Sequence, residues 1–258
     1  MLYIQGDCLN SMDLIPPGSI DLILSDLPYG QTKSKWDKRI DLGKLWKEYE
    51  RIIKPNGAII LFASGMFTAE LMKSNPKMWR YNLVWEKTSP TGFLNAKRMP
   101  LRAHEDICIF YKKMPVYNPQ MSRGVRKVAT AAHKRNSKSG DSYGKYRKVG
   151  YDSDKRYPRS VMKFKTDKQT AAYHSAQKPV ALLEYLIRMY SNEGDIVLDS
   201  CMGSGSTGVA CARTRRKFIG IEIDDTAFNQ AFERVTENAI EINKRGYLDA
   251  DSELHNKG

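Results

Sequence analysis

The sequence contains few cysteines, few histidines and no long apolar run. Its four cysteines and four histidines are scattered through 258 residues, and no two cysteines form a Cys-x-x-Cys pair. This spacing argues against a disulfide framework and a zinc site, so we expect reduced thiols and no bound metal. No apolar run approaches the roughly 20 residues that cross a bilayer, and the first residues show no secretory pattern. We therefore expect a soluble, cytoplasmic protein with no membrane partner.

Acidic residues are also in short supply. The chain has 42 lysines and arginines against 29 aspartates and glutamates, which gives a formal net charge of +13. Such an excess suggests a polyanionic partner, usually nucleic acid. Much of it lies between Lys112 and Lys168, where 17 basic residues accompany 4 acidic ones and tyrosines are interleaved. A disordered basic linker would have the same charge, but the tyrosines favour a module that faces DNA.

Length and patterning indicate one α/β core with an inserted module. Short apolar runs, typical of buried strands, alternate with segments of helical spacing. The expected strands are residues 1–5, 20–24, 58–63, 81–86, 106–111, 195–199 and 217–222, and the expected helices are residues 8–14, 42–53, 66–72, 180–190, 207–213 and 224–242. The expected division is a first core half (1–112), a basic insert (113–172), a second core half (173–245) and a polar, frayed tail (246–258). A long loop is expected at residues 87–104.

A first candidate site follows the strand at residues 20–24. Pro28 and Gly30 stop this strand, which leaves Asp26 and Tyr29 at the carboxyl edge of a sheet, where open α/β folds bind ligands. An ordinary turn is the alternative, since Asp, Pro and Gly are common in turns. Asp7 is a second carboxylate at a strand end, and its alternative role is a helix N-cap.

A second candidate site lies between Asp199 and Glu222. A strand, a turn containing Gly203 and Gly205, a helix and a further strand ending in an acid form a βαβ unit that suits a nucleotide-like ligand. The glycines allow close approach of the backbone, and the acid suits two ribose hydroxyls. No Gly-Lys-Ser/Thr follows, so the turn is not a Walker loop. Gly208 completes a loose dinucleotide spacing, which leaves NAD as a rival ligand.

The two sites together resemble a known enzyme family. Asp26-Leu27-Pro28-Tyr29 resembles Asp-Pro-Pro-Tyr, and Asp199-x-x-x-Gly203-Ser204-Gly205-Ser206 resembles Asp-Pro-Phe-x-Gly-Ser-Gly-Thr. These are the catalytic and cofactor motifs of DNA amino-methyltransferases that use S-adenosylmethionine. Their order, with the basic insert between them, resembles the circularly permuted β group, which methylates adenine N6 or cytosine N4. His174-x-x-Gln177-Lys178-Pro179 is similar to the segment that precedes the cofactor motif in that group.

The resemblance implies a fold and a set of site residues. The fold is a Rossmann-like class I methyltransferase fold with a mostly parallel central sheet and a basic inserted target-recognition region. The implied catalytic residues are Asp26, Leu27, Pro28 and Tyr29. The implied cofactor residues are Asp7, Cys8, Asp26, Lys178, Asp199, Ser200, Cys201, Gly203, Ser204, Gly205, Ser206, Glu222 and Ile223. The side chains expected to contact DNA are Lys35, Trp36, Lys97, Arg98, Arg102, Arg123, Arg126, Lys127 and Arg135.

The resemblance also assigns roles. Asp26 would accept one hydrogen of the target amine and the Leu27 carbonyl the other, while Pro28 holds that carbonyl and Tyr29 stacks on the flipped base. Lys178 would help to close the cofactor pocket, with a solvated lysine as the alternative. The chain departs from the family pattern where Leu27 replaces a proline, Ser200-Cys201 replaces Pro-Phe and Ser206 replaces threonine. Cys201 offers the cofactor less packing area than phenylalanine.

The expected reaction is methylation of adenine N6 in double-stranded DNA, because the family's cytosine enzymes favour serine where this chain has Asp26. Cytosine N4 stays open as a target, since either amine can donate to a carboxylate. An RNA or protein methyltransferase is opposed by the motif order, and a DNA-binding protein with a decayed site is opposed by the retained polar residues. Dimerisation is common in the group, which makes a homodimer a further expectation. The recognition sequence and a restriction-modification, phage or housekeeping role stay open.

Overall fold

The computed structural model describes residues 1–30, 37–129, 152–166 and 177–255. The chain divides into two compact units, one of Met1–Asn118 with Ser160–Gly258 and one of Pro119–Arg159. The second unit is shorter at both ends than the insert expected at residues 113–172. Asn118 explains one boundary, because its side-chain amide donates to the carbonyls of Arg188 (3.2 Å) and Ser191 (3.1 Å) in the larger unit.

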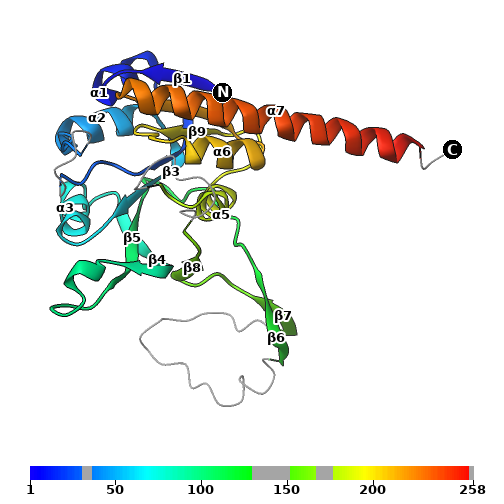
Figure 1. The fold of residues 1–258 in the computed structure, drawn as a ribbon, viewed down its shortest axis with the longest axis horizontal. Helices are drawn as coiled ribbons and strands as arrows, with labels where there is room; N and C mark the ends of the chain where they lie inside the picture. The colour runs from blue at the N-terminus through cyan, green and yellow to red at the C-terminus, as the bar shows by residue number, and fades with distance from the viewer. Residues whose placement is uncertain (31–36, 130–151, 167–176, 256–258) are drawn as a thin grey trace. The chain divides into compact units, whose positions relative to one another are not determined.

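The larger unit is built on a mostly parallel sheet, as predicted (Figure 1). Among the described residues, eight strands pair in the order β1-β10-β9-β2-β3-β5-β4-β8. Their bounds are β1 Leu2–Gln5, β2 Ile20–Ser25, β3 Ile53–Ala63, β4 Trp79–Thr91, β5 Arg102–Phe110, β8 Val161–Phe164, β9 Ile196–Asp199 and β10 Lys217–Glu222. Of these strands, β5 is antiparallel to both of its neighbours, and the other pairs are parallel.

Helices cover both faces of this sheet. One face carries α1 (Cys8–Ser11), the 3-10 turn η1 (Met12–Leu14), α2 (Leu42–Ile52) and α3 (Met66–Ser74), and the other carries α5 (Val180–Tyr190), α6 (Ser206–Arg213) and α7 (Asp225–His255). Successive strand residues point to opposite faces, so Leu22 and Leu24 pack in the α5–α7 core while Ile23 packs in the α1–α3 core. None of the helices, as far as the structure describes them, is long and apolar enough to cross a membrane.

Several segments differ from the sequence-based expectations. One is β8, which lies within the expected insert and pairs with β4 in the main sheet. The expected loop at residues 87–104 is strand at both of its ends, because β4 continues to Thr91, β5 begins at Arg102 and these two residues still pair. The apolar alternation that marks a strand is missing there because this part of the hairpin is largely exposed. The expected frayed tail is also wrong in part, since α7 continues to His255. Its last turns contain strong helix formers such as Leu248 and Glu253.

The smaller unit contains an antiparallel pair of strands. In it β6 (Ser122–Ala129) pairs with β7 (Asp152–Arg156), with Ser122 opposite Arg156. Sequence patterning did not predict these strands. Arg123 pairs with Asp154 at 3.0 Å while its side chain stays 88% exposed. The unit therefore presents basic groups to solvent.

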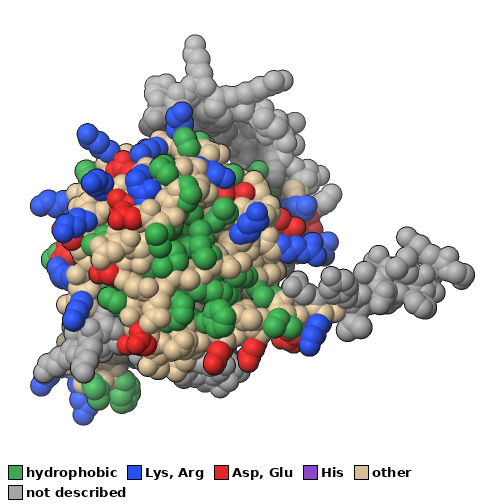
Figure 2. All heavy atoms as spheres, turned by 90° about the horizontal axis from the view of Figure 1, so that it is seen from above, with side chains coloured by type: hydrophobic (Ala, Val, Ile, Leu, Met, Phe, Trp, Pro, Cys, Tyr) green, Lys and Arg blue, Asp and Glu red, His purple; other side chains and the backbone are tan. Residues whose placement is uncertain are grey.

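Surface charge is not confined to the smaller unit. Figure 2 shows one face of the molecule, on which apolar side chains gather at the centre and lysine and arginine side chains lie around them, with aspartate and glutamate side chains among them. This distribution fits the net charge of +13. Lysine and arginine side chains therefore also lie on the surface outside the segment in which the sequence concentrates them.

Candidate active site

The two predicted motifs meet at neighbouring strand ends. β2 and β9 pair in parallel, with Leu22 opposite Val197, although they lie far apart in the chain. Where they end, the Ser200 amide donates to the Ser25 hydroxyl oxygen at 2.8 Å. In the sheet, β3 is the other neighbour of β2 and β10 is the other neighbour of β9, so the strand order changes direction at this junction. Such a switch in strand order is where open α/β sheets bind their ligands.

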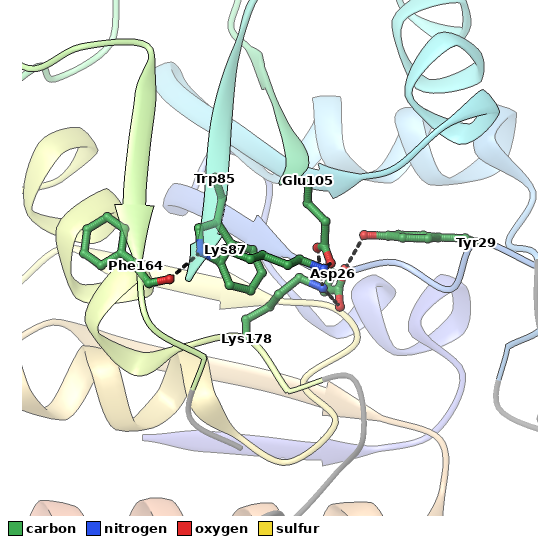
Figure 3. A network of polar contacts seen from close by, with 7 residues as sticks. All are labelled: Asp26, Tyr29, Trp85, Lys87, Glu105, Phe164 and Lys178. Carbon is green, nitrogen blue, oxygen red and sulfur yellow. Dashed lines mark hydrogen bonds and ion pairs between the residues drawn. The ribbon is translucent and has the colours of Figure 1, made fainter. Parts of the chain in front are cut away.

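Asp26 follows β2 at this junction, and both of its carboxylate oxygens accept hydrogen bonds (Figure 3). The Lys178 ammonium donates to Oδ2 at 2.5 Å, and the Tyr29 hydroxyl donates to Oδ1 at 2.9 Å. The Lys178 side chain is 9% exposed, whereas that of Asp26 is 26% exposed. Lys178 and Tyr29 therefore fix the position of the carboxylate, and part of its surface stays accessible to a ligand.

The ion pair extends into a four-residue network. Glu105 Oε2 lies 3.2 Å from Lys178 Nζ, and Glu105 Oε1 lies 2.5 Å from Lys87 Nζ. Lys87 stands on β4 and Glu105 on β5, and Lys178 immediately precedes α5. Two ammonium groups and two carboxylates balance in charge, which makes a largely buried cluster tolerable. We call Asp26, Lys178, Glu105 and Lys87 the ionic network.

Charge and burial oppose one another in this network. Burial raises the pKa of Asp26, and the charge of Glu105 adds to this shift while Lys178 opposes it. Burial alone would lower the pKa of Lys178, but the charges of Asp26 and Glu105 outweigh it and raise that pKa. The ammonium of Lys178 therefore stays protonated at neutral pH. It is the positive charge that most favours the ionised form of Asp26.

Aromatic residues pack around the ionic network. Tyr29 stacks on Phe67, with ring centroids 4.9 Å apart and an interplanar angle of 29°. Burial raises the pKa of Tyr29 well above its ordinary value and Asp26 adds to the shift, so the phenol stays protonated and donates. Trp85 lies beside Lys87, and its indole N–H donates to the Phe164 carbonyl at 3.1 Å. This bond connects the network to β8.

Leu27 and Pro28 follow Asp26 directly. Leu27 is 2% exposed and packs in the α1–α3 core, while Pro28 is partly buried. A buried apolar side chain at position 27 is consistent with a residue that offers a ligand only its backbone. The substitution of leucine for the family's proline is therefore accommodated by packing.

Two acidic side chains accept hydrogen bonds from the glycine-rich turn after β9 and the start of α6. Asp199 is 4% exposed and accepts bonds from the Cys201 amide (3.1 Å) and the Thr207 hydroxyl (2.6 Å). Burial raises the pKa of Asp199 to about 6. Glu222, at the end of β10, accepts from the Gly203 amide at 2.9 Å. The turn is thus held from both neighbouring strands.

The two glycines of this turn have different surroundings. Gly203 and Gly205 both have positive φ, at 48° and 75°, which glycine adopts without steric cost. A Cβ on Gly205 would lie 2.8 Å from the Val235 side chain, because α6 begins against α7. A Cβ on Gly203 would have no atom within 4 Å. Gly203 therefore borders open space, where a ligand can approach the backbone.

The end of β1 adds further residues beside this turn. Asp7 caps α1 by accepting from the Leu9 amide at 2.8 Å, which is the alternative role that the sequence suggested. Cys8 is buried, and a hydrogen bond with the Cys201 thiol lowers the pKa of Cys8 and raises that of Cys201. Ile223, next to Glu222, is 62% exposed.

The remaining cofactor predictions fall in the same turn. Ser200, Ser204 and Ser206 are buried, and the Ser200 hydroxyl lies 2.6 Å from that of Tyr49. Lys178 was predicted to close the cofactor pocket, and the structure places its ammonium on Asp26. Among the described residues, no cluster of three or more His, Cys, Asp or Glu side chains is arranged to hold a metal ion.

Sequence reasoning missed Lys87 and Glu105. Lys87 lies in the segment expected to be a loop, Glu105 lies just after it, and only the register of β4 and β5 brings them together. It also missed Arg234 on α7, which donates to the Ser204 carbonyl at 2.8 Å. The sequence shows each of these as a charged residue near a strand or on a helix, and this does not identify the residue that it contacts.

The predicted DNA contacts are spread over several segments. Lys97, Arg98 and Arg102 are exposed near the end of the β4–β5 hairpin, and Arg123 is exposed in the smaller unit. The structure describes the backbone of Arg126 and Lys127 within β6. Lys35, Trp36, Arg135 and His174 lie outside the described residues.

Sequence comparison finds relatives over most of the chain. A family model described as DNA methylase, covering N6 and N4 methyltransferases, matches residues 20–233. The Type II methyltransferase M.HpaI of Haemophilus parainfluenzae is 27% identical over 244 residues, which cover 90% of this chain and 73% of the relative. The Type II methyltransferase M.HinfI of Haemophilus influenzae is 28% identical over 271 residues, which cover 91% of this chain and 68% of the relative.

Structure comparison finds the same fold in solved proteins. The M1.HpyAVI–SAM complex matches with a TM-score of 0.64 at 23% identity, over 91% of this chain and 98% of that chain. The cytosine-N4-specific PvuII DNA methyltransferase matches with a TM-score of 0.62 at 17% identity, over 93% of this chain and 91% of that chain. Both likenesses are likenesses of fold.

Proposed function

This chain belongs to the N6/N4 DNA methylase family, and from that premise we propose that it methylates adenine N6 of a base flipped out of double-stranded DNA. The observation that carries the proposal is the position of Asp26. Its carboxylate lies where the ends of β2 and β9 meet, one residue beyond the hydrogen bond between Ser25 and Ser200. S-adenosylmethionine is the methyl donor.

The residues around the glycine-rich turn fit this cofactor. Gly203 borders open space, Glu222 and Asp7 carry carboxylates at adjacent strand ends, and Ile223 offers an exposed apolar side chain. Glu222 would hold the ribose hydroxyls, and Asp7 and Ile223 would contact the adenine. Cys201 is the smaller replacement for a packing phenylalanine. When bound, S-adenosylmethionine supplies an electrophilic methyl group.

Asp26 makes the target amine a better nucleophile. The lone pair of an exocyclic amine is delocalised into the ring, and a hydrogen bond to a carboxylate favours the pyramidal nitrogen of the transition state. Each carboxylate oxygen can accept about two hydrogen bonds. Oδ2 accepts from Lys178, and within the described part of the chain Oδ1 accepts a hydrogen bond only from the Tyr29 hydroxyl. Oδ1 therefore keeps capacity for the amine, and the Leu27 carbonyl would accept its second hydrogen.

The ionic network keeps Asp26 ready for this role. A buried carboxylate tends to be protonated, and a protonated Asp26 would lose acceptor capacity. Lys178 opposes that tendency, and Glu105 and Lys87 hold Lys178 in place. Glu105 and Lys87 are thus positioning residues, because they act on Asp26 through Lys178.

The aspartate favours adenine over cytosine. The named cytosine-N4 enzyme shares the fold, so the fold does not distinguish the two amines. A cytosine-N4 methyltransferase is the second candidate. A non-catalytic DNA-binding protein is disfavoured because Asp26, Tyr29 and Lys178 are joined in one bonded arrangement. Homodimer formation and a cytoplasmic location stay predictions, as does the role in a restriction-modification system that the names of the two relatives suggest.

Mass spectrometry of nucleosides tests the proposal. Unmethylated DNA is incubated with the protein and S-adenosylmethionine, and N6-methyladenine is the expected product. N4-methylcytosine would reverse the base assignment and keep the mechanism. Absence of any methylated base would reject DNA methylation.

A variant pair tests the catalytic assignment. Asp26→Ala should abolish methylation and retain DNA binding, because it removes only the acceptor. Glu193→Ala is the matched control, since Glu193 is an exposed carboxylate just before β9, at the opposite edge of the sheet. Methylation that survives Asp26→Ala would contradict the role of Asp26.

A further inference from the structure

The β4–β5 hairpin ends in an exposed apolar tip. We define the hairpin tip as residues 92–101, between the paired Thr91 and Arg102. Phe93 is 82% exposed and Leu94 is 99% exposed. Exposed apolar area is unfavourable in water, and two adjacent large apolar side chains on a protruding turn mark a contact surface.

The tip has a defined backbone conformation. Gly92 adopts φ 93° and starts the 3-10 turn η2 (Phe93–Asn95), in which the Asn95 amide donates to the Gly92 carbonyl at 2.9 Å. The Arg98 amide then donates to the Asn95 carbonyl at 2.8 Å. These bonds hold Phe93 and Leu94 on the outside of the hairpin.

The charges around the tip indicate the chemistry of its partner. No aspartate or glutamate occurs between Lys87 and His104. Lys97, Arg98 and Arg102 are exposed in the same segment. A protein partner or a second copy would need only the apolar groups, whereas a duplex offers phosphates to the basic groups and stacked bases to the apolar ones.

The hairpin tip and two members of the ionic network, Lys87 and Glu105, lie on the same hairpin. Glu105 is three residues from Arg102 along β5, or about 10 Å at the usual rise of a strand. Glu105 contacts Lys178, which contacts Asp26. A duplex whose target base reaches Asp26 would therefore present its neighbouring base steps to the tip.

We infer that Phe93 and Leu94 enter the base stack of DNA beside the target base pair and stabilise the gap that the flipped base leaves. Flipping costs the stacking and pairing of the target base. Apolar side chains placed between base steps offset part of this cost, as in proteins that kink DNA. The inference rests on the proposed function.

The test uses a double variant and a matched control. Phe93→Ala with Leu94→Ala removes the apolar groups and leaves the basic ones. Leu2→Ala with Leu14→Ala removes two apolar side chains that are 52% and 74% exposed on other parts of the surface. Sequencing of DNA methylated by the wild type identifies the site, and a duplex with that site carries 2-aminopurine at the target position to report flipping.

The double variant should lose most of the 2-aminopurine fluorescence increase and at least about 10-fold in kcat/KM. A duplex with a mismatch at the target base should restore most of the activity, because a mismatched base costs less to flip. A merely structural defect would not be rescued in this way. The control variant should match the wild type on both duplexes.

Three outcomes would overturn the inference. The first is an equal 2-aminopurine fluorescence increase in the double variant and the wild type. In that case methylation by the wild type would still support the proposed function. An equal loss on matched and mismatched duplexes would indicate a structural role. A change in molar mass in solution would assign the tip to self-association.

Discussion

At the scale of single residues, Lys178 is the positive charge that most opposes the rise in the pKa of Asp26. Its ammonium lies 2.5 Å from Asp26 and 3.2 Å from Glu105. If it is removed, Asp26 keeps the burial and the repulsion from Glu105 that raise its pKa and loses the charge that opposes them. A lysine at this position therefore decides over which pH range Asp26 can accept a hydrogen bond.

Lys178→Met should move the acidic limb of the pH–rate profile to higher pH. The sign follows because activity needs ionised Asp26, activity falls as pH falls through the pKa of Asp26, and the variant raises that pKa. Lys178→Arg should restore most of the profile because it keeps the charge. The measurement is kcat against pH.

Lys54→Met is the matched control, because Lys54 pairs with Asp21 near the amino end of β2. Its profile should coincide with that of the wild type. An unshifted acidic limb in Lys178→Met would mean that Asp26 does not limit the rate at low pH.

The β9–α6 turn illustrates what one element demands of its sequence. Gly205 has φ 75°, and a Cβ there would meet Val235 at 2.8 Å and Ala231 at 3.1 Å on α7. Backbone conformation and helix packing therefore both require glycine. Gly194 has a similar φ of 85° but no atom within 4 Å of an added Cβ.

Gly205→Ala should lower the free energy of unfolding by about 2–4 kcal/mol, from left-handed strain of about 1–2 kcal/mol and overpacking against α7. Gly194→Ala should cost only the strain. Urea denaturation of both variants isolates the packing contribution as the difference between them. Equal losses would show that α7 moves away to accommodate the methyl group.

The molecule as a whole is a basic protein whose partner is a polyanion. Lysines and arginines exceed aspartates and glutamates by 13, and they lie on the hairpin tip, in the smaller unit and around the face in Figure 2. Binding of such a surface to DNA releases counterions, so affinity depends on how many phosphates are neutralised.

Affinity for duplex DNA should fall steeply between 50 and 200 mM salt, by about 0.9 logarithmic units per decade of salt for each phosphate contact. Lys97→Gln with Arg98→Gln should reduce the slope by about 1.8 if each side chain contacts one phosphate. Lys54→Gln with Lys217→Gln, at strand positions near the amino edge of the sheet, should leave it unchanged. Fluorescence anisotropy gives the slope, and a flat wild-type profile would contradict phosphate binding.

The sequence by itself determined most elements of the larger unit and the two motifs. Buried strands such as β2 and β10 and helices such as α5 were predictable, because their apolar periodicity reflects local burial. Asp26 and Gly203 could be singled out because each lies in the turn that follows a buried strand. A family resemblance then supplied their roles.

Only the tertiary structure decided which distant residues act together. Asp26 meets Lys178 across 152 positions of the chain, and Glu105 meets Lys87 through the register of the β4–β5 hairpin, part of which sequence patterning treats as a loop. Periodicity reports whether a residue is buried and does not report its neighbour. The ionic network depends on strand order and register, which are set by the packing of the whole sheet.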